Sequence, residues 1–333
     1  MLNSFSKIVQ NRLASLPKND YPVLNTRLFI SIWLSYAMDK SLTSMRDIFK
    51  RLNGTGYELD ISTFSKANAS RSQEPFLRLY QQLNEEICRQ KSLQKYELCP
   101  IDSTVITLTS KLLWLQEYYQ VKLVSSLNLT TGVPEENLIN FGYDSDYRYG
   151  KEMLASLPPN GVGVMDRGFS SLKFLRLAQQ SNKYFVLRIP NNYKLQFSEN
   201  KGQFLVGTGK DSGIYRVVNF CDLEKRAEYR LATNLERAEV SDEELMEIYK
   251  YRWHIELLWK FLKMHLKLDK LITKNVNGIA IQIYVSLIAY LILKIVDIPK
   301  EWGTTLLDKL RYLQCCMCQE ISYVHWIERL LSG

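Results

Sequence analysis

Three acidic residues stand where a carboxylate needs a specific partner. Asp102 lies within an apolar, β-branched run and Asp166 ends another, whereas Glu256 lies on the polar side of a long helical segment. An unpaired carboxylate is costly to bury, so strand acids normally face a hydrogen-bond donor, a cation or a metal. Taken alone, either aspartate is explained equally well as a structural turn acid. Taken together, the three acids favour Mg²⁺, which prefers oxygen ligands and keeps coordination sites for water and substrate phosphate.

Glu256 belongs to a segment, 243–270, that contains no Gly or Pro and predicts one helix of several turns. Ser241 and Asp242 precede it as residues that can cap a helix. At about 100° per residue, one polar sector collects Tyr249, Arg252, Glu256 and Lys263, with Lys260 and Lys267 close to it. The opposite side is an apolar stripe that suits burial against a core. A solvated face with Glu-to-Lys pairs is the ordinary explanation, so the sector gains meaning only with the two aspartates.

The residues around the aspartates predict an α/β fold. Strands are expected at 96–108, 121–129, 136–141, 161–166, 184–189 and 230–235, from their β-branched and aromatic residues. Helices are expected at 149–157 and 171–180, so strand and helix alternate and some strands should pair in parallel. Side chains at the carboxyl ends of such strands are the usual place for chemistry. Residues 190–230 are polar and punctuated by Gly, and they predict a small β insertion.

The first 90 residues predict helices only, at 26–38, at 44–52, after a cap at Ser62, and at 75–90. Their order resembles a helix-turn-helix in which Ser65, Lys66, Asn68 and Arg71 would face a DNA groove. The connection is longer than the usual tight turn, so a plain helical bundle explains the pattern equally well. A late apolar run, 279–296, is interrupted by Gln282, Ser286 and Lys294, which favours a buried core helix over a membrane span.

The chain of 333 residues carries a formal charge of +8 at pH 7, which favours a polyanionic partner, with nucleic acid as the leading class. Its six cysteines lack the regular spacing of a secreted disulfide framework, so reduced thiols are expected. The first 17 residues lack the apolar core of a signal peptide. We therefore expect a soluble, cytoplasmic protein.

The three acids and their neighbours resemble a known family, the DDE transposases of bacterial insertion sequences. The matching motifs are Asp102-Ser103-Thr104, Asp166-Arg167-Gly168-Phe169 and Tyr249-x2-Arg252-x3-Glu256-x6-Lys263. The last spacing is the hallmark of the insertion-sequence-four family. The resemblance extends from about residue 95 to residue 295.

This resemblance implies an RNase H-like catalytic core that is interrupted by a β-rich insertion. On that division we expect an all-helical N-terminal region at 1–92, the core at 93–189 and 231–298, the insertion at 190–230 and a helical C-terminal tail at 299–333. The resemblance also implies that Asp102, Asp166 and Glu256 bind two Mg²⁺ ions, for which Mn²⁺ can substitute. One ion would activate water or a DNA 3′-hydroxyl, and the other would stabilise the leaving oxygen.

By the same resemblance, a second group of residues would hold the phosphates of the DNA end. These are Tyr249, Arg252, Lys263, Lys260 and Arg167. Arg grips phosphate bidentately and Lys acts as a point charge, so the residue types suit the role. The partners implied are the inverted-repeat ends of the element, a target DNA and a second copy of the chain, in the nucleoid of a bacterium.

The function implied is cleavage and strand transfer of the element's own DNA, by a cut-and-paste route. Two alternatives are a metal-dependent nuclease that does not join DNA and a degenerate copy that only binds it. One departure concerns relatives that cleave through a hairpin, which hold a flipped base with an aromatic residue, often Trp. The insertion has no Trp, and its aromatic residues are Tyr193, Phe197, Phe204, Tyr215, Phe220 and Tyr229. The hairpin route is therefore a hypothesis here.

Overall fold

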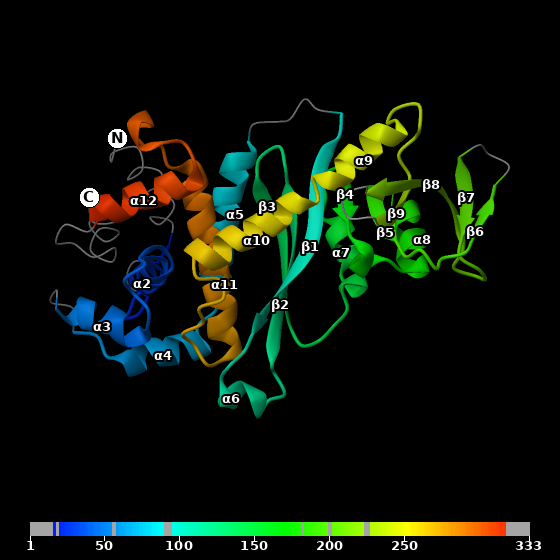
Figure 1. Cartoon of the computed structure of the whole chain (residues 1–333). Helices are drawn as coiled ribbons and strands as arrows, with labels where there is room; N and C mark the ends of the chain where they lie inside the picture. The colour runs from blue at the N-terminus through cyan, green and yellow to red at the C-terminus, as the bar shows by residue number, and fades with distance from the viewer. Residues whose placement is uncertain are drawn as a thin grey trace. The chain divides into compact units, whose positions relative to one another are not determined.

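The computed structural model describes residues 16–17, 20–54, 58–89, 95–181, 183–198, 202–222 and 227–317 (Figure 1). The chain divides into two compact units. The helical unit comprises Met1–Arg89, Leu108–Tyr119 and Lys260–Gly333, and the sheet unit comprises Gln90–Thr107 and Gln120–Trp259.

Among the described residues, the sheet unit contains one nine-stranded sheet with the order β3-β2-β1-β4-β5-β9-β8-β7-β6. The strands are β1 (Glu97–Thr107), β2 (Gln120–Asn128), β3 (Val133–Phe141), β4 (Gly161–Met165), β5 (Tyr184–Ile189), β6 (Leu195–Phe197), β7 (Gln203–Val206), β8 (Gly213–Asp222) and β9 (Ala227–Thr233). β4 pairs in parallel with β1 and with β5, while the other neighbours pair antiparallel. The predicted mixed α/β fold with some parallel pairing is confirmed.

Alternating side chains along the central strands build two apolar layers, one on each face of the sheet. Met165 and Leu187 belong to the layer that α7 (Gly150–Ala155) and α8 (Leu172–Gln180) cover. Val164 and Val186 belong to the opposite layer, which α9 (Asp242–Lys250) covers. Successive residues of a strand face opposite sides, so each of these strands is buried on both faces.

The segment predicted as one helix over 243–270 forms two helices, α9 and α10 (Trp253–His265). At the junction, amides bond to carbonyls three residues back: the Arg252 N–H donates to Tyr249, and the Ile255 N–H to Arg252. This tighter turn interrupts the regular ladder. α10 ends at His265, before the predicted end at 270, and Lys267 then adopts a left-handed φ of 58°. The prediction of a single continuous helix is therefore wrong, although both halves are helical.

The helical unit is built around α11 (Val276–Ile295). Its other helices are α2 (Thr26–Met38), α3 (Met45–Asn53), α4 (Ile61–Ser70), α5 (Glu74–Cys88), α6 (Lys111–Trp114), η3 (Lys300–Trp302) and α12 (Leu306–Met317). α11 contacts α2, α4, α5 and α12. Within the described residues it is the one helix long and apolar enough to cross a membrane, but 83% of its most apolar window is buried. It serves as the predicted core helix.

Two details of α4 differ from the sequence prediction. Its cap is Asp60, whose side chain accepts the Ser62 N–H at 2.6 Å, and Ser62 lies inside the helix. Asn68, predicted to face a DNA groove, is fully buried, and its Oδ1 accepts the Trp33 Nε1–H at 2.9 Å. Its backbone carbonyl also accepts from Asn277. Asn68 is thus a core residue that joins α4 to α2 and α11.

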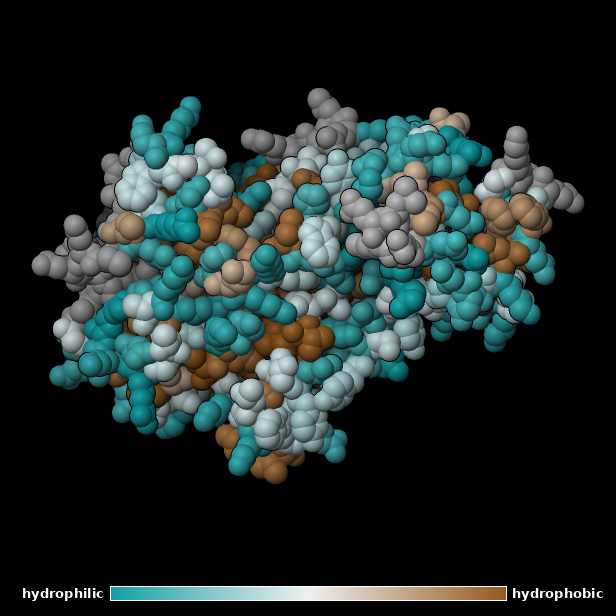
Figure 2. Space-filling model, viewed as in Figure 1, coloured by the Kyte–Doolittle hydropathy of each residue, from teal (hydrophilic) through white to brown (hydrophobic). Residues whose placement is uncertain are grey.

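Large apolar side chains are exposed at α6, which follows β1 at the tip of the β1–β2 hairpin. Leu115 is 84% exposed, and Leu112 and Trp114 are also exposed. Figure 2 shows apolar atoms gathered over this tip.

Candidate active site

Asp102 and Asp166 are brought together by the parallel pairing of β1 and β4. Ile101 on β1 lies opposite Met165 on β4, and the next residue of each chain segment is the aspartate. Neighbouring strands lie roughly 4.8 Å apart, so the two acids lie next to each other at the carboxyl end of β4. Since Ile101 belongs to the layer under α7 and α8, Asp102 points to the face that α9 covers.

Each aspartate is held by a backbone amide just after it. The Ser103 N–H donates to Asp102 Oδ1 at 2.8 Å. The Gly168 N–H donates to Asp166 Oδ1 at 2.7 Å, which makes Asp166 the cap of the short helix η2 (Arg167–Phe169). In each case the donor is a main-chain amide, so its position depends on the backbone and not on a second side chain.

The pKa of Asp102 reflects burial and several charged neighbours. Burial is the main cause that raises its pKa to about 7; the charges of Asp166 and Glu256 also raise it, whereas the Ser103 amide and Arg252 lower it. Its side chain is 15% exposed. Burial therefore disfavours the ionised form more strongly than Arg252 and the Ser103 amide stabilise it.

Arg252 links the aspartate to the helix acid. Its Nη2 donates to Glu256 Oε1 at 2.5 Å, and its Nη1 lies 3.5 Å from Asp102 Oδ2. Burial lowers the pKa of Arg252, but Glu256, Tyr249 and Asp102 outweigh burial and raise it overall. Arg252 therefore stays charged and joins the two acidic elements, as the turn between α9 and α10 directs its side chain to β1.

Tyr249 lies in the same region but is only 9% exposed. It packs edge-on against Phe220, with ring centroids 6.3 Å apart. Burial raises its pKa, while the cations Arg252 and Arg188 lower it. The hydroxyl therefore sits among charged groups, and the ring belongs to the core under α9.

The remaining predicted cations lie on exposed or half-buried positions. Arg167 directly follows Asp166 and is exposed. Lys260, which is exposed, and Lys263, which is half-buried, lie about one and two turns beyond Glu256 along α10. The acids, Arg252 and Tyr249 thus meet within the sheet unit, and the two lysines continue the polar side of the helix.

The donor set suits a hard cation, but its present geometry is not a closed cage. Carboxylate oxygens are the ligands that Mg²⁺ prefers, and a cation would favour the ionised form of Asp102, which burial disfavours. Within the described part of the chain, no three His, Cys, Asp or Glu side chains are grouped closely enough to hold one ion. The Arg252 guanidinium contacts both Asp102 and Glu256, so it occupies space between these two acids.

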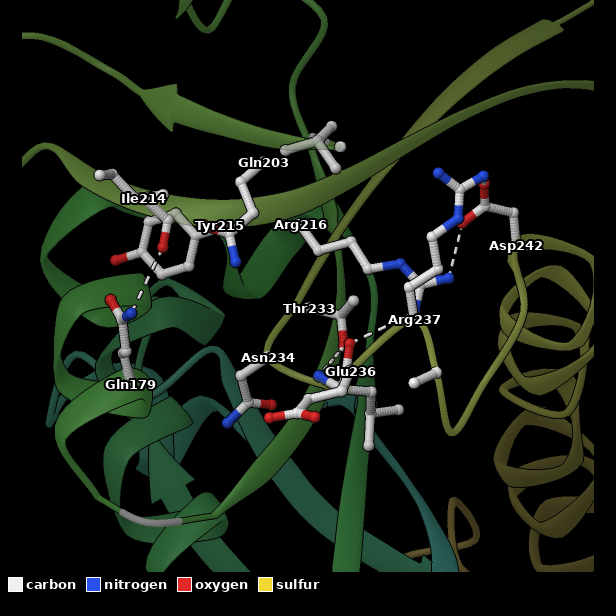
Figure 3. Close-up of a pocket in the computed structure, with 14 residues that line it drawn as sticks. Gln179, Gln203, Ile214, Tyr215, Arg216, Thr233, Asn234, Glu236, Arg237 and Asp242 are labelled. Atoms are coloured by element: carbon white, nitrogen blue, oxygen red, sulfur yellow. Dashed lines mark hydrogen bonds and ion pairs between the residues drawn. The ribbon is translucent and has the colours of Figure 1, made fainter. Parts of the chain in front are cut away.

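A cavity of about 460 Å³ lies elsewhere in the sheet unit (Figure 3). It is lined by α8, by β8 and by the segment after β9, where Asn234 accepts the Phe185 N–H at the amino end of β5. Asp166 follows the carboxyl end of β4, so the cavity and the acids lie at opposite ends of these strands. Its Arg216 is paired with Asp242 at 2.6 Å. We assign the chemistry to the acids and none to this cavity.

Two charged residues beside the acids escaped the sequence analysis. Arg188 lies near the carboxyl end of β5 and acts on Tyr249. Asp146 opens the short helix η1 (Asp146–Arg148) and pairs with Lys122 at 2.7 Å. The signal was present, because Arg188 and Lys122 are single charges inside apolar strands, and a buried charge needs a partner.

Comparisons with known proteins bear on the same part of the chain. The family model described as Transposase DDE domain matches residues 93–292, a range that contains all three acids. A protein of Synechocystis sp., named as a transposase for insertion sequence element IS4SA, is 52% identical over 338 residues, covering 99% of each chain. A protein of Geobacillus stearothermophilus, named as a transposase for insertion sequence element IS5377, is 24% identical over 253 residues, covering 70% of this chain and 62% of that protein.

Proposed function

The chain belongs to the DDE transposase family of insertion sequence elements, and we propose that it cleaves and joins the ends of its own element through Asp102, Asp166 and Glu256. The observation that carries the assignment of these residues is the parallel register that sets Asp102 beside Asp166, with Arg252 connecting Asp102 to Glu256. The register and this ion-pair link support a shared role for the three carboxylates.

We propose that the three carboxylates hold divalent cations, Mg²⁺ with Mn²⁺ as a substitute. Bound there, two such ions would supply activation of the attacking hydroxyl and charge stabilisation of the leaving oxygen. Glu256 Oε1 accepts a hydrogen bond from Arg252 Nη2, so Glu256 would have to release that guanidinium in order to act as a ligand. Asp102 would bind its ion as the anion, which its raised pKa disfavours until a cation is near.

We further propose that Arg252, Arg167, Lys260 and Lys263 bind the phosphates of the DNA end. Arg252 is placed for this role because a DNA phosphate would offer the same acceptor geometry as the two carboxylates that it now contacts. Tyr249 has a buried ring and a hydroxyl among charged groups, so it would act on the DNA through its hydroxyl.

We propose that the sheet unit contains an RNase H-like core in which 190–230 is an insertion, while a helix-turn-helix and a plain helical bundle both stay open for 1–92. Strands β6–β8 lie in that insertion and extend the sheet at its far edge. For a cut-and-paste route through hairpin ends, Phe197 is the candidate aromatic residue, since it is 88% exposed and rests against Phe204. Ends that never become covalently closed during cleavage would remove the hairpin hypothesis.

The first experiment is cleavage of a DNA that carries the element's ends, with Mg²⁺ or Mn²⁺, comparing the wild type with Glu256→Gln. The substitution keeps the shape and removes the charge, so we expect nicking at the element boundary to fall more than about 100-fold. Removal of the metal with EDTA should abolish nicking in the wild type. DNA binding, followed by gel shift, should persist in the variant.

Glu247→Gln is the matched control, because Glu247 is an exposed acid on α9 that pairs only locally with Lys250 at 2.6 Å. Equal nicking by the Glu256→Gln variant and the wild type would remove Glu256 from the chemistry. Metal-dependent nicking without joined products would favour the nuclease alternative. DNA binding without nicking by the wild type would favour the degenerate copy.

A further inference from the structure

A fourth carboxylate, Asp146, lies against both segments that carry the catalytic aspartates. It opens η1, and its side chain is 22% exposed. The sequence analysis gave it no role, because it lies in a polar loop between β3 and α7. Its contacts reach β1 on one side and η2 on the other.

On the β1 side the contact runs through Ser103. The Ser103 hydroxyl donates to Asp146 Oδ1 at 2.8 Å, while the amide of the same residue donates to Asp102. Ser103 faces away from Asp102, because successive strand residues alternate. One residue therefore ties Asp102 on one face of the sheet to Asp146 on the other.

On the η2 side the contact runs through Gly168. A Cβ added at Gly168 would lie 2.9 Å from Asp146 Oδ2 and 3.0 Å from Asp166 Oδ1, so Asp146 packs closely against this glycine. The amide of Gly168 donates to Asp166. The arrangement repeats that of Ser103: the residue that holds a catalytic aspartate through its N–H also rests on Asp146.

Asp146 forms an ion pair with Lys122 on β2. Lys122 Nζ donates to Asp146 Oδ1 at 2.7 Å and to the Asp144 carbonyl at 2.5 Å, and its side chain is 10% exposed. This ion pair holds the Asp146 carboxylate in place. Asp146 is thus anchored to a third strand while it contacts the other two segments.

We propose that Asp146 is a positioning residue that sets the separation of Asp102 and Asp166, and with it the affinity of the site for divalent cations. This inference rests on the proposed function, since it takes Asp102 and Asp166 as metal ligands. Groups that hold metal ligands in place typically change metal affinity by about 10-fold to 100-fold when they are lost.

The test is direct titration of the DNA-free protein with Mn²⁺ by calorimetry, together with the Mg²⁺ dependence of nicking. Asp146→Ala should weaken Mn²⁺ binding about 10-fold or more and raise the half-saturating Mg²⁺ concentration by a similar factor. At saturating Mg²⁺ the nicking rate should recover to within a few-fold of the wild type. Asp146→Asn keeps the shape and an acceptor for Ser103, so its shift should be smaller.

A double-mutant cycle with Ser103→Ala tests the route of the effect. Ser103→Ala keeps the amide that holds Asp102 and removes only the hydroxyl that contacts Asp146. If both act through one contact, the double variant should shift metal binding no more than Asp146→Ala alone. Shifts that multiply would overturn the link through Ser103.

Asp144→Asn is the matched control, because Asp144 is an acid of the same loop whose carboxylate pairs with Arg148 at 2.5 Å. It should leave Mn²⁺ binding unchanged. The proposal is overturned if Asp146→Asn and Asp146→Ala bind Mn²⁺ as the wild type does, or if they lose rate at every metal concentration with no shift in half-saturation. Either result leaves the proposed function intact provided that Glu256→Gln still abolishes nicking.

Discussion

At the residue scale, Asp102 combines burial with three charged neighbours. The neighbouring acids disfavour its ionised form, while Arg252 and the Ser103 amide favour it. A group in this situation lowers the stability of the folded protein in order to be ready for a ligand. We propose that the same buried position that makes Asp102 costly as a free anion strengthens its interaction with a bound cation.

This conflict predicts a pH-dependent gain in stability for Asp102→Asn when EDTA removes divalent metal. The pKa of Asp102 is about 7 in the folded protein and near its ordinary value of 3.8 in the unfolded chain. Between these values the folded chain binds the extra proton, so the stabilising contribution is present below about pH 4 and is lost as the pH rises through 7. Asn has no charge to bury, so its Tm should exceed that of the wild type by several degrees at pH 8.

The Tm difference should shrink as the pH is lowered toward 4, and thermal unfolding at several pH values measures it. Asp144→Asn serves as the control, since Asp144 is paired at the surface. A Tm difference of the same size at pH 8 and pH 4.5 would show that the charge of Asp102 is not its source.

At the scale of elements, the pair α9 and α10 decides where Arg252 and Glu256 point. α9 starts with a capping box, in which Ser241 accepts the Glu244 N–H at 3.1 Å and Glu244 accepts the Ser241 N–H at 2.7 Å. Three acidic residues in its first turn suit the positive end of the helix. The cap thus stabilises the first turn of α9. The turn after Lys250 then sets the direction of Arg252.

Loss of this cap should cost measurable stability. Ser241→Ala removes the acceptor of the Glu244 amide, and such losses typically destabilise by about 1 kcal/mol. We expect a lower urea midpoint and faster hydrogen exchange at the first amides of α9. Ser241→Thr keeps the hydroxyl and should restore most of the loss. A midpoint as low for Thr as for Ala would mean that packing, and not the cap, is responsible.

At the scale of the whole molecule, the two units differ in architecture. The sheet unit positions the acids, whereas the helical unit is a bundle around α11 with polar links such as the bond from Gln282 Nε2 to the Lys270 carbonyl. The charge of +8 suits binding to a polyanion along an extended surface. A single chain offers one set of three acids, while an element has two ends.

We therefore expect two protomers to assemble on two ends. Mixing end fragments of two lengths with the protein should give a gel band that contains both lengths, and light scattering should report two chains in that complex. Cleavage should depend on the paired complex, because each end would meet one active site. Full cleavage of a single end by one protomer would contradict this assembly. A fragment without the terminal repeat is the control for non-specific binding.

The sequence by itself singled out the three acids and the Tyr-Arg-Glu-Lys spacing as candidates and predicted most of the elements that carry them. These follow from local patterns, since strand and helix periodicity and turn residues act over a few neighbours. The long apolar helix was identified as core on the same grounds, and α11 confirms it.

Only the tertiary structure decided which groups meet. Asp102 and Asp166 adjoin because β1 and β4 pair in parallel, a contact between segments far apart in sequence that no local pattern encodes. The burial of Asn68 and Tyr249 likewise depends on what other helices and strands cover. The break between α9 and α10 also lay beyond the sequence, because every residue there is compatible with a continuous helix. Asp146 gained its place through hydrogen bonds and packing from three separate segments, which only the folded chain brings to one point.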